Sequence, residues 1–145
     1  MSGDRAVTPW AAGTQGRPVV LGVAADLVEW VGLWPGVYWP GYDEDRGYRA
    51  GDPVCLFGAV VVAADPTGEP RCGDAYWFGT SPWWAWSPPV VAAVAAVARY
   101  LGVTTTDPAG GVWAWSAAAG RTAGEVVAVL RGGRDAAVLE RRGRL

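Results

Sequence analysis

The chain has 145 residues, of which 51% are hydrophobic and 18% charged, and its formal net charge is −2. This length fits one domain whose core needs no metal or disulfide, and the composition excludes a disordered chain. The chain has no His, which excludes His-based triads, zincin sites and facial-triad iron sites. It has only two Cys residues, and no signal peptide or bilayer-length apolar run is evident, so we expect a cytoplasmic protein.

The first predicted helix begins at Pro18, because Pro suits the first turn of a helix. From Val19 onward apolar residues recur at helical spacing, and Trp34-Pro35-Gly36 is predicted to stop the helix. Residues 35–51 then form a long loop in which Pro and Gly recur. Loops of this length without structure of their own are often functional.

The second predicted helix covers residues 54–64, which are apolar on every side and so should lie at the centre of the molecule. Asp52-Pro53 resembles a helix start, with Asp as the N-cap and Pro at the first position. The alternative is a buried β-strand, because Val60-Val61-Val62 is β-branched. The length of the segment and its start signal favour the helix.

Two further helices have clear boundary signals. Ser87-Pro88 repeats the N-cap-plus-Pro pattern, and an apolar stripe runs from there to Gly102, which suits a helix C-terminus. Thr122 and Glu125 form a capping box for the last helix. Gly132-Gly133 is expected to end or kink that helix. Residues 103–121 connect the two helices with at most one short helical turn.

These elements predict a mainly α protein, a compact single-domain bundle of about four helices with long loops rich in Trp, Pro and Gly. The predicted domain covers residues 18–140. A flexible leader, residues 1–17, precedes it, and a basic tail, residues 141–145, follows it. The tail contains three Arg residues. We interpret it as a solvated helix end, favoured there by the helix dipole, in preference to a nucleic-acid contact.

Ten tryptophans are the most unusual feature of the composition. Two interpretations are open. The indole rings fill the ends of a core made mostly of Ala and Val, or they form a binding surface, since Trp is enriched at interface hot spots. The predicted binding residues of the aromatic loops are Tyr38, Trp39, Trp77, Trp83, Trp84 and Trp86.

Other candidate chemistry has a simpler explanation. Asp43-Glu44-Asp45 lacks the spacing of an EF-hand, and we interpret it as an acidic turn, so no metal site is predicted. Cys55 has no His to activate it as a nucleophile. Glycine-rich phosphate loops are also absent. We therefore predict no catalytic residues and no cofactor, and the sequence favours binding or assembly over enzymatic activity.

Two stretches together resemble a family of uncharacterised small helical proteins from high-GC bacteria and their phages. One is Cys55-Leu56-Phe57-Gly58-Ala59, and the other runs from Trp115-Ser116 through Gly120-Arg121-Thr122 to Glu125-Val126. The resemblance implies a compact helical fold and no established activity. The family has Asn-Asp where this chain has Ser116-Ala117. The motif residues Cys55, Gly58, Trp115, Arg121, Thr122 and Glu125 all have sufficient structural explanations.

The sequence therefore predicts a non-enzymatic interaction or assembly module that binds a protein partner, or a second copy of itself, through its aromatic loops. An alternative is a small-molecule-binding protein or enzyme with a Trp-lined pocket. A further alternative is a DNA-associated regulator that uses the Arg-rich tail. Membrane association is not expected, and a nucleic-acid partner is disfavoured by the negative net charge.

Overall fold

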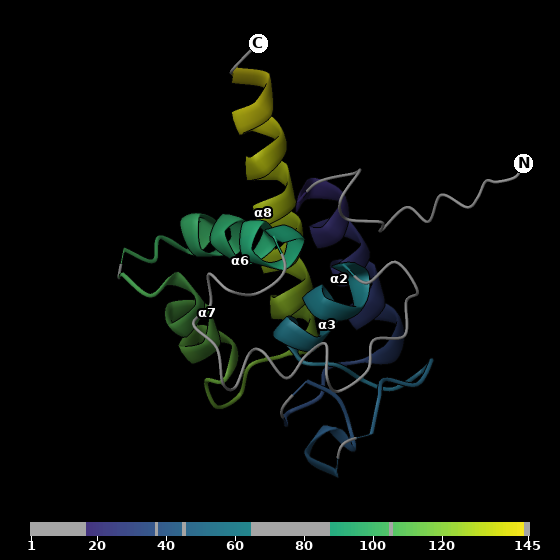
Figure 1. Cartoon of the computed structure of the whole chain (residues 1–145). Coiled ribbons are helices and arrows are strands. Elements are labelled where there is room, and N and C mark those ends of the chain that lie inside the picture. Colours follow the sequence, from purple (N-terminus) through teal and green to yellow (C-terminus); the bar gives the residue numbers. More distant parts are fainter. Residues whose placement is uncertain (1–16, 37, 45, 65–87, 105, 144–145) are drawn as a thin grey trace, which may run out of the picture.

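The computed structural model describes residues 17–36, 38–44, 46–64, 88–104 and 106–143 (Figure 1). Within these residues the protein is mainly α, as predicted, with five α-helices where the sequence suggested about four. None of these helices is both long and apolar enough to cross a bilayer. The helices are α2 (Arg17–Val31), α3 (Leu56–Ala64), α6 (Pro88–Leu101), α7 (Pro108–Ser116) and α8 (Ala123–Gly143), with a short 3-10 helix η1 (Tyr42–Glu44) between α2 and α3.

The longest helix, α8, packs against both α2 and α6 (Figure 1). It runs antiparallel to α2, because Arg131 pairs with Glu29 whereas Arg134 lies against Gly22. α3 packs against α2 and α6, and all its residues from Leu56 to Ala63 are buried. The prediction of a central, wholly apolar helix over this segment is confirmed, and the alternative of a buried strand is excluded.

α2 ends at Val31, three residues before the predicted stop. Gly32 has φ +91°, a conformation that favours glycine, and its N–H donates to the Val28 carbonyl oxygen at 2.8 Å. Leu33 then pairs with Val54 in an isolated parallel β-bridge. The glycine therefore ends the helix before the predicted Trp-Pro-Gly signal is reached.

The start predicted for α3 was wrong, because Asp52-Pro53 does not cap the helix. α3 begins at Leu56, and Cys55 occupies the cap position. Its carbonyl accepts from the Ala59 N–H at 2.9 Å, and its Sγ accepts from the Gly58 N–H at 3.4 Å. The bridge from Val54 to Leu33 holds the preceding backbone extended, which delays the helix.

α6 begins at Pro88 and ends before Gly102, which has φ +77°, as the sequence predicted. Ser87, its predicted cap, lies outside the described residues. α7 is a nine-residue helix where only one short turn was predicted. Asp107 caps it by accepting from the Gly110 N–H at 3.0 Å, and Pro108 follows. This is the same N-cap-plus-Pro signature that was recognised elsewhere in the chain.

Gly132-Gly133 neither ends nor kinks α8, which continues to Gly143. A Cβ at Gly132 would overlap the ring of Tyr100, and one at Gly133 would touch Leu21 and Val97. The two glycines therefore let α6 and α2 approach α8 closely. Their packing contribution outweighs the helix propensity that glycine loses, about 1 kcal/mol per residue.

We predict that Gly58→Ala destabilises the protein by about 1–3 kcal/mol. A Cβ there would overlap the backbone carbonyl of Tyr38, which cannot rotate away as a side chain can. Gly124→Ala is the matched control, since its nearest neighbour would be Thr122 Oγ1 at 3.9 Å. Urea unfolding of both variants measures the difference. Equal stability of Gly58→Ala and the unsubstituted protein would contradict this packing.

Candidate functional site

The segment between α2 and α3 forms a closed loop, residues 32–55, which we call the aromatic loop. The bridge between Leu33 and Val54 closes its neck. The Trp34 N–H donates to the Val54 carbonyl oxygen at 2.9 Å, and the Val54 N–H donates to that of Gly32 at 3.2 Å. Because its ends are joined, the loop is a compact unit at the end of the molecule opposite the C-terminus of α8 (Figure 1).

Aromatic side chains fill the interior of this loop. Trp39 is only 1% exposed, and Tyr38 and Tyr48 are also buried. Trp39 meets Tyr42 and Tyr48 edge to face, with ring centroids 5.6 and 5.7 Å apart. Its Nε1–H donates to the Arg46 carbonyl oxygen at 2.9 Å, and the Tyr48 hydroxyl donates to that of Asp52 at 3.0 Å. The polar ends of Trp39 and Tyr48 are thus satisfied by the loop's own backbone.

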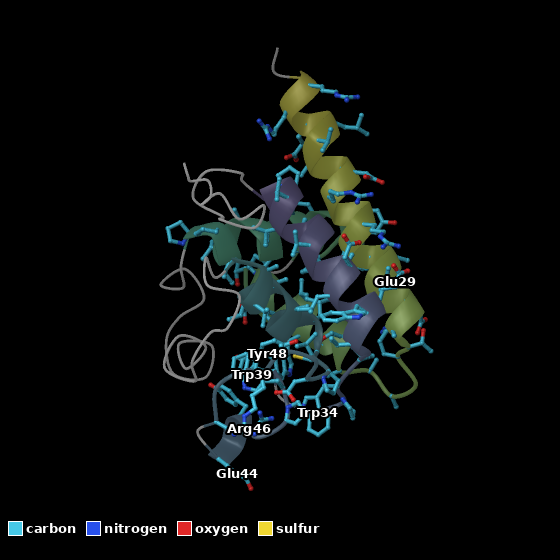
Figure 2. The ribbon with its side chains drawn as sticks, turned by 90° about the vertical axis from the view of Figure 1, so that its right-hand side faces the viewer. Glu29, Trp34, Trp39, Glu44, Arg46 and Tyr48 are labelled. Atoms are coloured by element: carbon cyan, nitrogen blue, oxygen red, sulfur yellow. The ribbon has the colours of Figure 1, made fainter. Side chains whose placement is uncertain are left out.

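Arg46 ties the two sides of the aromatic loop together (Figure 2). Its guanidinium forms an ion pair with Asp52 at 3.0 Å and also donates to the Pro40 carbonyl oxygen. Asp52 in turn accepts from the Arg49 N–H at 3.1 Å. Asp52, which was predicted to start a helix, instead stabilises this loop through its contacts with Arg46 and the Arg49 N–H. Both side chains of the ion pair are largely covered, so solvent screens it less than a fully exposed pair.

Tyr38 lies where the aromatic loop meets α3. It is the one described non-glycine residue with positive φ, at +54°. Its carbonyl oxygen accepts from the Cys55 N–H at 3.0 Å and abuts Gly58. Burial, with smaller contributions from Tyr42 and Cys55, raises the pKa of the Tyr38 hydroxyl. The side chain is therefore a neutral phenol at physiological pH, suited to packing.

Cys55 is a cap and packing residue in this structure. Burial is the main cause that raises the pKa of its thiol, although nearby N–H groups, that of Gly58 first, act in the opposite direction. A protonated thiol is a weak nucleophile. Among the described residues no cluster of three or more His, Cys, Asp or Glu side chains is placed to hold a metal ion.

Trp113, from α7, packs against the edge of the aromatic loop. Its ring centroid lies 5.2 Å from that of Phe57 and 6.2 Å from that of Tyr38. The side of Trp113 away from these rings faces solvent, since the residue is 38% exposed. Tyr42, which is partly exposed, packs on the same Tyr38 ring at 4.5 Å. We call these two partly exposed rings, Trp113 and Tyr42, the aromatic surface.

An acidic turn adjoins this surface. η1 carries Tyr42 and ends at Glu44, which is exposed at the tip of the loop (Figure 2). The sequence places Asp43 and Asp45 on either side of Glu44. The turn combines the partly exposed ring of Tyr42 with the negative charge of Glu44, on a loop whose interior is fixed by hydrogen bonds. Such a surface is chemically suited to bind cationic side chains.

The second family-like motif forms a separate cluster at the start of α8. Arg121 lies 3.9 Å above the Trp115 ring, and its Nε–H donates to the Trp115 carbonyl oxygen at 2.9 Å. Thr122 and Glu125 exchange hydrogen bonds of 2.8 and 3.1 Å, so the predicted capping box is confirmed. The Thr122 N–H is the main cause that lowers the pKa of the Glu125 carboxyl. Every one of these contacts stabilises the turn between α7 and α8.

The structure thus places the predicted site residues in different ways. Tyr38 and Trp39 are buried, so they support the loop and do not offer a surface. Trp77, Trp83, Trp84 and Trp86 lie outside the described residues, and their role as binding residues stays a prediction. Trp113 was not singled out from the sequence. Recognition of Asp107-Pro108 as a helix start would have placed it on α7, facing the core of the aromatic loop.

Comparison with known proteins identifies one family. The model of a family described as of unknown function (DUF6197) matches residues 15–136. This range includes the aromatic loop, α7 and both motif stretches on which the resemblance was based. No curated protein and no solved structure matches the chain.

We predict that Cys55 reacts slowly with iodoacetamide in the folded protein. In a Cys72→Ser variant, Cys55 is the remaining thiol. The thiolate is the reactive form, so a raised pKa lowers its fraction at pH 8 and extends the rise of the rate to higher pH. We expect alkylation at least about tenfold slower than for free cysteine. Mass spectrometry follows the reaction, with the urea-unfolded variant as control, and native rates equal to those of free cysteine would contradict the result.

Proposed function

Because this chain belongs to the family of unknown function DUF6197, we propose its function from the site itself: a helical interaction module that binds a basic segment of a protein partner on the aromatic surface. The observation that supports this best is the position of Trp113. Its ring is 38% exposed, while its other side packs on the buried rings of Phe57 and Tyr38. A large indole is thereby presented at a fixed angle on a rigid base.

Preorganisation is the energetic reason for this proposal. Binding to a loop that must first become ordered costs conformational entropy, and that cost lowers affinity. In the aromatic loop, the bridge from Leu33 to Val54 and the Arg46–Asp52 ion pair already fix the backbone. Trp and Tyr supply a large contact area with few rotatable bonds, which is why they are common in hot spots. Trp113 and Tyr42 have these properties.

The charge of the surroundings indicates the chemistry of the partner. Residues 1–120 contain 11 Asp and Glu and 6 Arg, a net charge of −5, and three of those acids occur together at residues 43–45. Arg and Lys side chains stack on aromatic faces and pair with carboxylates. An acidic turn that carries one of the two partly exposed rings, Tyr42, therefore favours a basic peptide over a neutral or an acidic one, and also accelerates its approach.

We predict that the protein binds Arg-rich synthetic peptides and not Glu-rich peptides of equal length, as measured by isothermal titration calorimetry. Trp113→Ala should weaken binding about tenfold or more, in the range of interface hot spots. Glu44→Arg should weaken it most at low salt, because an exposed charge acts over distances that added salt screens.

Two controls keep this test decisive. Leu139→Ala removes an exposed apolar side chain near the C-terminus of α8, at the end of the molecule opposite the aromatic loop, and should leave the affinity unchanged. Glu44 packs in no core, so Glu44→Arg tests the surface even if Trp113→Ala lowers stability. The proposal is wrong if Arg-rich and Glu-rich peptides bind alike, if neither binds, or if Glu44→Arg binds the basic peptide as well as the unsubstituted protein does.

A further inference from the structure

Four large hydrophobic side chains are exposed within the described part of the chain: Trp30, Tyr100, Trp113 and Leu139. Two of them have packing partners that account for their positions. Tyr100 lies over Gly132, and Trp113 packs on Phe57. Trp30, at 76%, and Leu139, at 65%, are the most exposed, and both lie on the α2–α8 pair. Leaving such side chains in water forgoes the free energy that their burial would contribute.

Acidic side chains surround Trp30. Glu29 precedes it, and Asp26 lies one helical turn before it on α2. Both acids are mostly exposed, with side chains 62% and 73% accessible, although each also pairs with Arg131 at 3.0 Å. Two carboxylates thus share a single guanidinium, which leaves this end of α2 acidic. Figure 2 shows Glu29 on the outer side of the α2–α8 pair.

Basic side chains follow Leu139. Arg141 and Arg142 are exposed in the last turn of α8, where the helix dipole favours cations. This end of α8 extends beyond α2 and α6 (Figure 1). Glu140 is turned toward Arg99 of α6, with which it pairs at 3.1 Å, so it does not neutralise the two arginines. The end of α8 therefore presents an exposed apolar residue, Leu139, and two exposed positive charges, Arg141 and Arg142.

The acidic end of α2 and the basic end of α8 carry opposite charges, but they cannot meet within one molecule. α2 and α8 are antiparallel, and Arg131, which marks the acidic end, precedes Arg141 by ten residues, about 15 Å of helix. We propose that a second copy of the chain covers this face, with the two α2–α8 pairs antiparallel about a two-fold axis. Trp30 of each copy then packs on Leu139 of the other, and Arg141 and Arg142 pair with Asp26 and Glu29.

Two-fold symmetry makes this contact twice, so the assembly closes as a dimer and does not continue into a fibre. Each contact supplies one apolar pair and one set of opposite charges. The dimer does not rest on the proposed binding of basic peptides, because Trp113 and Glu44 lie outside this face. It would present two aromatic surfaces to a partner.

The first test is the mass in solution, measured by size-exclusion chromatography with light scattering over a range of protein concentrations. We expect the mass to approach twice the 15.2 kDa of one chain and to fall with added salt. Trp30→Ala should weaken the dimer. Asp26→Arg combined with Glu29→Arg should abolish it, and so should Arg141→Glu combined with Arg142→Glu. Trp113→Ala is the matched control, an aromatic truncation that should leave the dimer unchanged.

Mixing the two charge variants gives the decisive result. Each variant alone brings like charges together in both contacts. In the mixed dimer, one contact joins the unsubstituted basic tail of one chain to the unsubstituted acidic end of the other. The second contact joins the two substituted ends, whose charges are both reversed and therefore again opposite. We expect a 1:1 heterodimer, which also shows that both variants are folded. A monomeric unsubstituted protein, a dimer that survives either variant, or a mixture that stays monomeric would each overturn the proposal.

Discussion

The contact between the Tyr38 backbone and Gly58 determines how the aromatic loop is attached to the helices. Because Gly58 has no side chain, the Tyr38 carbonyl reaches the first turn of α3 and accepts from the Cys55 N–H. This fixes Tyr38 at φ +54° and directs its ring toward Tyr42 and Trp113. The motif around Cys55 and Gly58 thus has a physical explanation. It makes room for the backbone of the aromatic loop and caps the helix that the loop enters.

Much of the fold was predictable because the apolar pattern and the caps agree. α2, α6 and α8 were predicted from helical spacing, α3 from its length and its start signal, and the Thr122–Glu125 capping box from its local pattern. The errors arose where tertiary packing decides. Gly132 ends no helix because Tyr100 occupies the space beside it. Asp52 caps no helix because Arg46 and the Arg49 N–H take its carboxylate. The contact with Tyr100 joins residues far apart in the sequence, and the Arg46–Asp52 pair forms because the aromatic loop folds back on itself.

The candidate site was less predictable, because exposure is a property of the assembled fold. Trp39 and Trp30 occur close together in the sequence, yet one is 1% and the other 76% exposed. The interpretation that indoles fill the end of a core of slim side chains holds for Trp39. Its ring covers an end of the molecule where the nearby helix α3 supplies mostly Val, Ala and Gly. The exposure of Trp113 depends on its position on α7, a helix that begins with the Asp107 cap and that was not predicted.

In this arrangement, the residues that support the aromatic loop differ from the residues that are available to bind a partner. The polar ends of the buried Trp39 and Tyr48 rings are satisfied by the loop backbone, so these rings add stability without chemistry available to a partner. The groups left for recognition are those with one free side, such as Trp113 and Glu44, and those beyond the ends of the helices. The charge is distributed in the same way, since residues 121–145 have 6 Arg and 3 acids, +3, against −5 in the rest. Arg131 pairs with Asp26 and Glu29 within the chain, but Arg141 and Arg142 lie about 15 Å of helix beyond that pair, so their attraction to these acids is available between molecules. That physical condition connects the helical packing with the assembly and binding proposed for this protein.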